Sequence, residues 1–88
     1  MASQKNDIPS FEELCELFNY TPKGRPLNTE EAAAILHCSR VTLEVKRVNG
    51  GGPRFFRPRG TRKVLYSEKD VLAFLASGAQ YSTSESVA

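Results

Sequence analysis

Two short helix-forming runs lie almost end to end in this chain, and their spacing constrains the fold more than any other feature. The first run, "EEAAAILH", follows Asn28 or Thr29, either of which can cap a helix N-terminus. It stops at "HCS", where Ser39 can cap a second helix that continues to Asn49. Two short helices with almost no linker are typical of a helix-turn-helix.

The interior of this pair is predicted from side-chain size. Ala33 is small enough to let the two helices cross closely. Leu36, Cys38 and Leu43 are expected to fill the angle between them. "NGGGP" then ends the second helix, with Asn49 and Gly50 suited to left-handed dihedral angles.

A β-hairpin is predicted after the second helix. "RFFR" and "RKVLY" are two short β-like segments separated by "PRGT". Phe55 and Phe56 are expected to form the core of this hairpin rather than a stacking platform for RNA bases.

Two further helices flank this region. Ser10 and Glu13 have capping-box spacing and begin an amphipathic helix over residues 11–20. Ser67 and Asp70 repeat that spacing before "EKDVLAFLAS", which ends at Gly78. The fold class is therefore mainly α with a small β-hairpin, a winged helix-turn-helix. The predicted parts are a mobile N-terminus (1–9), an extra helix and linker (10–26), the winged helix-turn-helix (27–78) and a disordered tail (79–88).

The basic residues are concentrated in the middle of the chain. Net charge is only +2, but Ser39 to Lys69 holds nine bases against two acids, Glu44 and Glu68. Such a block indicates a surface for a polyanion. A solvated basic face is the alternative. The bases are Arg40, Lys46, Arg47, Arg54, Arg57, Arg59, Arg62, Lys63 and Lys69.

Other classes of protein are disfavoured by what the chain contains. Cys15, Cys38 and His37 do not form a metal-ligand pattern, so no metal and no cofactor is expected, and the thiols are expected to be reduced. No apolar run is long enough to span a bilayer, and "MASQKNDIPS" has no apolar signal region, so we expect a cytoplasmic protein. The carboxylates occupy capping or solvent positions, and we expect no enzyme.

Double-stranded DNA is the expected partner. One helix can enter the major groove, about 12 Å wide, while the hairpin contacts the backbone or the minor groove. Ser39 and Thr42 would donate to phosphate, Arg40 and Arg47 would contact phosphate or guanine, and Glu44 would accept from cytosine. The bases of the wing would neutralise phosphates or read a narrow minor groove; they are Arg54, Arg57, Arg59, Arg62 and Lys63.

The rotation of the second helix is open. Val41, Val45 and Val48 form a stripe that periodicity alone would bury. Leu43, the expected core residue, points almost to the opposite side. If Leu43 is buried, the valines face outward, where they would meet thymine methyl groups or a partner protein. We favour the outward valines; the alternative is a rotated helix with Lys46 and Arg47 toward DNA.

Residues 27–77 resemble the small excisionase-like helix-turn-helix proteins related to the MerR superfamily. The elements that carry this resemblance are "EEAA", "SRVTLE", "GGGPRFF", the basic stretch ending in "VLY", and "EKDVLAFL". By resemblance, Ser39 to Val48 is the recognition helix and Arg54 to Lys63 the wing. His37 stands at a turn position where this family usually has glycine, so we expect it either to adopt an unusual dihedral angle or to bend the motif. Lys46 stands where an aromatic residue or leucine is commoner.

The resemblance implies a recombination directionality factor. Such a factor binds and bends attachment-site DNA and directs a tyrosine recombinase, the integrase, toward excision. Its copies bind adjacent sites cooperatively, and its location would be the nucleoid. Family members also regulate transcription on mobile elements, which is the alternative function. A protein-interaction module that docks through the acidic N-terminal helix and the valines is a third reading.

Overall fold

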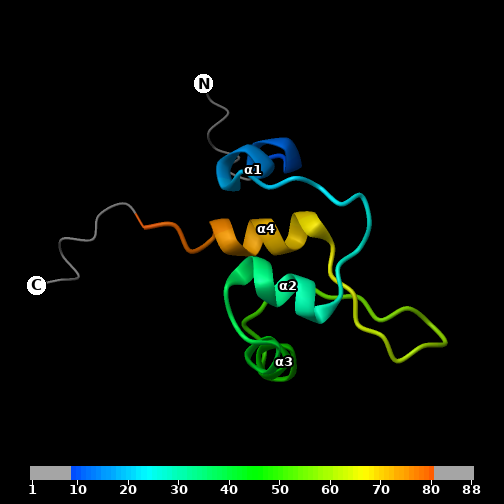
Figure 1. Ribbon diagram of the computed structural model, residues 1–88. Helices are drawn as coiled ribbons and strands as arrows, with labels where there is room; N and C mark the ends of the chain where they lie inside the picture. Colours follow the sequence, from blue (N-terminus) through cyan, green and yellow to red (C-terminus); the bar gives the residue numbers. More distant parts are fainter. Residues whose placement is uncertain (1–8, 81–88) are drawn as a thin grey trace, which may run out of the picture.

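Four short helices form the part of the chain that the computed structural model describes, residues 9–80. They are α1 (Phe11–Phe18), α2 (Thr29–Leu36), α3 (Arg40–Asn49) and α4 (Glu68–Ala76). α4 crosses the middle of the molecule and packs against α1 on one side and α2 on the other, and α2 packs against α3 (Figure 1). The predictions of a mobile segment at 1–9 and a disordered tail at 79–88 fall largely outside the described residues.

Every helix begins at the cap that the sequence predicts. Ser10 and Asn28 form reciprocal capping boxes with Glu13 and Glu31, respectively. The side chain of Ser39 accepts from the N–H of Thr42, and that of Ser67 accepts from the N–H of Asp70. These bonds satisfy N–H groups that the first turn of a helix leaves without a partner, which explains why the helices begin where they do.

One hydrophobic cluster holds the helix-turn-helix together. Its buried members come from α2, α3, α4 and the segments that precede α2 and α4; they are Leu27, Ala32, Ala33, Leu43, Tyr66 and Val71. Leu36 and Cys38 pack against the cluster, as the sequence predicts. Ala33 is 3% exposed, so a small side chain does occupy the closely packed position in α2. Leu27 and Tyr66 also exchange two backbone hydrogen bonds of 2.8 Å, which tie the linker to the segment before α4.

The turn between α2 and α3 adopts the unusual backbone that His37 leads one to expect. His37 ends α2 in the left-handed region, at φ 59° and ψ 40°. The N–H of Cys38 then donates to the carbonyl of Ala33 at 3.0 Å. The prediction for Asn49 is wrong, because Asn49 is the last residue of α3. Positive φ angles occur instead at Gly50 and Gly51, at 87° and 94°.

The predicted β-hairpin is not confirmed as a sheet. Within residues 9–80 the only pairings between extended residues are two isolated bridges, of which Phe56–Leu65 joins the two predicted segments. In this register the next hydrogen-bonded pair toward the tip would be Pro58 with Lys63, and proline has no N–H to donate. In the other direction the pair would be Arg54 with Ser67, and Ser67 is the N-cap of α4.

The segment therefore forms a loop tied at its base. We call residues 57–64 the basic loop. The N–H of Thr61 donates to the carbonyl of Pro58 at 3.3 Å, which places the turn at the predicted "PRGT". The loop extends away from the helices (Figure 1). Among the described helices, none is both long and apolar enough to cross a membrane.

Candidate nucleic-acid interface

The rotation of α3 is settled by Leu43, which is 1% exposed and belongs to the core. Because Leu43 faces inward, Val41, Val45 and Val48 face outward, at 65%, 50% and 82% exposure. The alternative with buried valines is wrong. The remaining exposed surface of α3 includes Arg40 and Thr42.

The basic loop is joined to α3 through one aromatic ring. The guanidinium of Arg47 on α3 lies 5.7 Å from the centre of the Phe55 ring, and that of Arg57 in the loop lies 6.0 Å from it. Arg47 also donates to the Tyr66 hydroxyl at 3.0 Å. Arginine stacks well on aromatic faces, so these contacts hold α3 and the base of the loop together. The two predicted DNA-binding elements thus lie side by side.

A groove of about 560 Å³, which we call the charged groove, lies between the start of α2, the exposed edge of α3 and the basic loop. Both signs of charge line it. The acids are Glu30, Glu31 and Glu44, and the bases are Arg25, Arg40, Arg47, Arg62 and Lys63. Bases therefore outnumber acids in the groove, and they come from α3 as well as from the loop.

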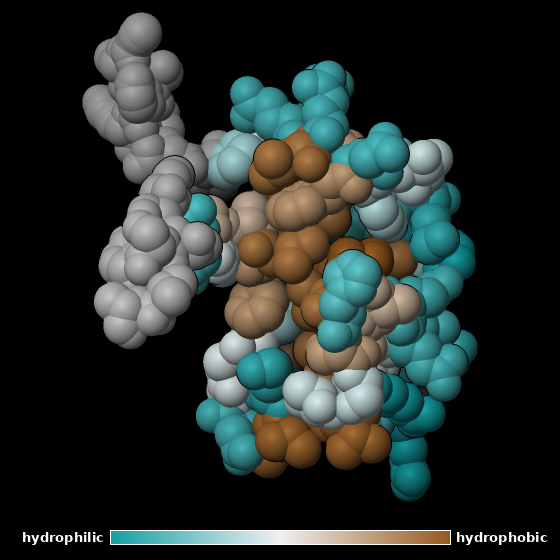
Figure 2. Space-filling view, turned by 60° about the vertical axis from the view of Figure 1, so that its left-hand side comes forward, coloured by the Kyte–Doolittle hydropathy of each residue, from teal (hydrophilic) through white to brown (hydrophobic). Residues whose placement is uncertain are grey.

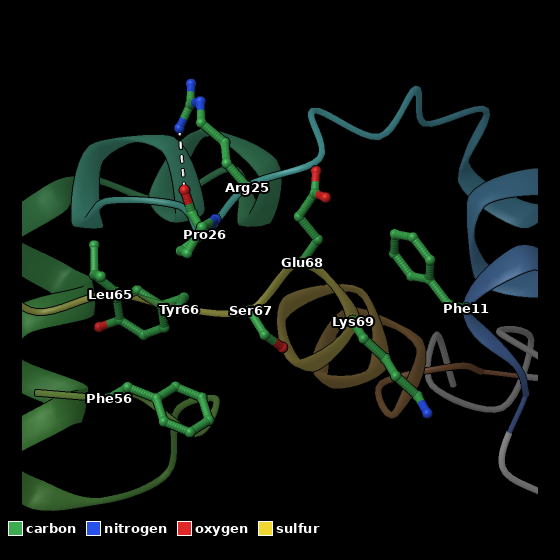
Figure 3. A pocket seen from close by; sticks show the side chains of 9 residues that line it. All are labelled: Phe11, Arg25, Pro26, Phe56, Leu65, Tyr66, Ser67, Glu68 and Lys69. Atoms are coloured by element: carbon green, nitrogen blue, oxygen red, sulfur yellow. Dashed lines mark hydrogen bonds between the residues drawn. The ribbon is translucent and has the colours of Figure 1, made fainter. Parts of the chain in front are cut away.

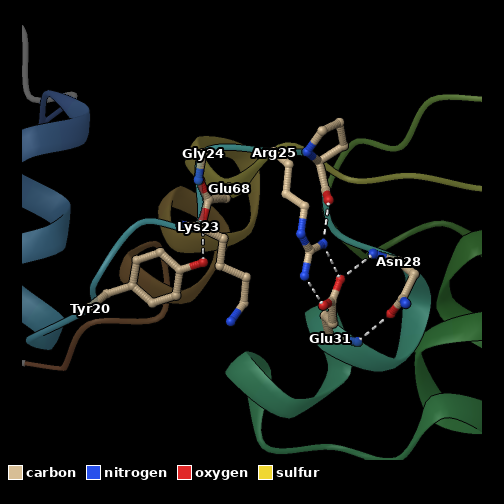
Figure 4. Close-up of polar contacts among 8 residues, drawn as sticks. Tyr20, Lys23, Gly24, Arg25, Asn28, Glu31 and Glu68 are labelled. Carbon is tan, nitrogen blue, oxygen red and sulfur yellow. Dashed lines mark hydrogen bonds and ion pairs between the residues drawn. The ribbon is translucent and has the colours of Figure 1, made fainter.

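The acids of the groove are held in ion pairs. Arg25 makes a two-pronged contact with Glu31, at 2.9 and 2.6 Å (Figure 4). This hydrogen bonding by Arg25, with the N–H of Asn28, lowers the pKa of the Glu31 carboxyl to about 2. Arg40 contacts Glu44 at 2.9 Å and Glu30 at 3.5 Å. The surplus positive charge therefore rests on Arg47, Arg62 and Lys63.

Several predicted site residues already have partners within the chain. The predicted base-reading pair, Arg40 and Glu44, bind each other, so either can reach a base only by releasing or reorienting the other. The hydroxyl of Ser39 donates to that of Thr42 at 2.9 Å. Thr42 is left with a hydroxyl proton to donate at the exposed N-terminal turn of α3, where the helix dipole favours an anion.

Three predicted wing residues, Arg54, Arg57 and Arg59, are not among the residues that line the groove. Arg54 is held elsewhere. Its guanidinium pairs with Asp70 at 3.2 Å and lies 5.0 Å from the centre of the Phe56 ring. Arg59, at the turn of the basic loop, is exposed.

A second groove, of about 500 Å³, has a largely apolar surface, and we call it the apolar groove. It runs between α1 and the start of α4 (Figure 3). Phe11 and Phe56 lie on opposite sides of it, and Leu65 lies on the same side as Phe56. Phe56 is 44% exposed, so the prediction that both phenylalanines form a hairpin core is wrong for Phe56. Phe55 packs against the core instead.

The carboxylate of Glu68 is buried, although the sequence alone predicts a capping or solvent position for it. Glu68 is 9% exposed and accepts hydrogen bonds from the Tyr20 hydroxyl, the N–H of Lys23 at 2.8 Å and the N–H of Gly24 at 3.3 Å (Figure 4). Its partners lie 44 to 48 residues earlier, so no local spacing could reveal them. Within residues 9–80, no set of three metal-ligating side chains gathers.

A family comparison agrees with this arrangement. The family described as a helix-turn-helix domain matches residues 26–79, which include α2, α3, the basic loop and α4. α1 lies before the matched region. No curated protein and no solved structure matches the chain.

Proposed function

We propose that this chain, which belongs to the helix-turn-helix domain family, is an accessory factor for site-specific recombination that binds and bends attachment-site DNA. The coarser assignment, a DNA-binding helix-turn-helix protein, is the premise of this proposal. The observation that carries it is the joining of α3 and the basic loop by Arg47, Phe55 and Arg57. Two elements held in this way can contact two neighbouring grooves of one duplex.

The proposed docking follows from this geometry. α3 enters the major groove, and the basic loop reaches the adjacent backbone or minor groove as a wing. The phosphate strand between them runs along the charged groove, where Arg62 and Lys63 neutralise it. Arg59 at the turn of the loop extends this contact.

Bending would follow when several copies bind side by side. Neutralising one face of a duplex and holding its grooves at fixed positions favours curvature, at a cost that depends on the sequence deformed. The curved DNA would bring integrase-bound sites together, and the tyrosine recombinase would supply the chemistry. The proposed factor performs no catalytic step of its own.

Footprinting with the full chain on the DNA that flanks its own gene tests the proposal. Protected adjacent repeats beside a recombinase attachment site, together with stimulated excision in vitro, would support it. A single protected site at a promoter, with no effect on excision, would favour regulation of transcription instead. Absence of any mobility shift on duplex DNA at low salt would overturn both and would favour a protein-interaction module.

A further inference from the structure

The valines of α3 form an apolar stripe on a helix that otherwise presents polar side chains. Val41, Val45 and Val48 are each at least half exposed. Their positions lie about 140–200° around the helix from Leu43, the buried residue of α3, so the core cannot contain both. Figure 2 shows a hydrophobic area at the bottom of the molecule, over α3, separated by hydrophilic surface from the larger one above it. Burying each valine elsewhere would be favourable.

The surroundings of the stripe favour a polyanion as its occupant. Arg40 and Arg47 lie along one edge of α3, and Arg62 and Lys63 lie across the charged groove from that edge. A second copy of the chain packed stripe against stripe would bring these bases close to their own counterparts. DNA instead offers negatively charged phosphates to these bases while the valines make an apolar contact.

The major groove presents one apolar group, the C5 methyl of thymine. We propose that the valine stripe contacts thymine methyl groups and gives the chain a preference for A·T-containing sites. This inference rests on the proposed docking of α3 in the major groove. From Val41 to Val48 the helix rises about 10 Å, at about 1.5 Å per residue. That length covers roughly three base-pair steps of about 3.4 Å.

Replacing thymine by deoxyuridine tests this inference, because it removes the methyl and keeps every hydrogen-bonding group. The full chain is titrated by fluorescence anisotropy into a labelled alternating dA–dT duplex and into the same duplex with uracil for thymine. The expected result is weaker binding to the uracil duplex, by about fourfold for each contacted methyl lost. Equal affinity for the two duplexes would overturn the inference and leave the proposed function standing.

Matched variants identify the side chains responsible. Val45→Ala and Val48→Ala change exposed positions, so we expect both to fold, as circular dichroism would show. Each should bring the two affinities closer together. Lys63→Ala, in the basic loop, should weaken binding to both duplexes and keep their ratio.

Two outcomes separate the inference from its alternatives. If the chain binds neither duplex, nor any other at low salt, the proposed function fails and the inference with it. If Val45→Ala converts a dimer to a monomer in sedimentation velocity and leaves the thymine-to-uracil ratio unchanged, the stripe binds a second copy, and the inference is overturned.

Discussion

Glu68 shows how one side chain ties α1 and its linker to the helix-turn-helix. Burial raises the pKa of this carboxyl. Hydrogen bonds from the N–H of Lys23, the Tyr20 hydroxyl and the N–H of Gly24 lower the pKa by more than burial raises it, so the net shift is downward. Burial, together with the hydrogen bond to Glu68, raises the pKa of the Tyr20 hydroxyl. A lowered pKa in the folded state means that ionised Glu68 stabilises the fold above its ordinary pKa. This stabilisation is lost as the pH falls toward the folded-state pKa.

Glu68→Gln should therefore lower the free energy of unfolding at neutral pH by about 1–3 kcal/mol, because an amide places a donor against backbone N–H groups. It should also reduce the loss of stability that the parent chain shows below about pH 4.3. Urea denaturation at several pH values measures both effects. Glu16→Gln, at an exposed position of α1, is the control. Parallel pH profiles for the parent and Glu68→Gln would contradict this account.

Substitution of Arg40 tests whether a single side chain of α3 reads a base directly. Its pairs with Glu44 and Glu30 hold it over the exposed edge of α3. We expect Arg40→Ala to reduce the discrimination between a selected site and random DNA by about 1–3 kcal/mol if the guanidinium binds guanine. Competition binding measures this, with Lys69→Ala on α4 as the control. Equal losses on both DNAs would show that Arg40 contacts phosphate only.

At the scale of elements, the sequence predicts what is local. The start of each helix follows from a side chain that bonds a backbone N–H three residues later, as at Ser39 and Thr42. The basic loop is harder to predict than the helix starts, because its backbone pairing depends on which residues of the two segments lie opposite each other. The alternation in "RFFR" and "RKVLY" favours strands, but Pro58 and the start of α4 stop the ladder after a single bridge.

The turn between α2 and α3 offers a prediction about stability. His37 has φ 59°, where a side chain costs about 1–2 kcal/mol and glycine does not. The greater conformational freedom that glycine gives the unfolded chain offsets about 0.5–1 kcal/mol of the strain that the substitution relieves. His37→Gly should therefore raise the free energy of unfolding by about 0.5–1 kcal/mol. Ala34→Gly, in helical backbone, should lower it by about 1 kcal/mol. Urea denaturation of both variants checks the contrast, and destabilisation by His37→Gly would show that its imidazole makes a stabilising contact.

At the scale of the whole molecule, the described residues divide into two sides. α1 packs against one side of α4, and α2, with α3 beyond it, packs against the other (Figure 1). The apolar groove includes Phe11 of α1 and the start of α4, whereas the charged groove lies between the start of α2, α3 and the basic loop. The sequence predicts the charged side because its bases are close together along the chain. The apolar groove depends on contacts between α1 and residues near α4, which local patterns do not specify.

Salt dependence distinguishes a basic loop that binds phosphate from one that is merely solvated. Each phosphate neutralised by the chain releases counterions, so the logarithm of the binding constant falls with that of salt concentration by about 0.9 per contact. Changing Arg57, Arg59 and Arg62 to Ala should weaken binding across all sequences and reduce that slope by about 1 for each arginine that contacts phosphate.

The control for this measurement is a variant that removes charge elsewhere. Lys23 and Lys69 are exposed and lie outside the residues that line the charged groove. Changing both to Ala also lowers the net charge, but it should leave the salt slope nearly unchanged, because counterion release depends on contact rather than on total charge. If both variants changed the slope equally per charge removed, the loop would act only through the overall field, and the wing would have no place at the interface.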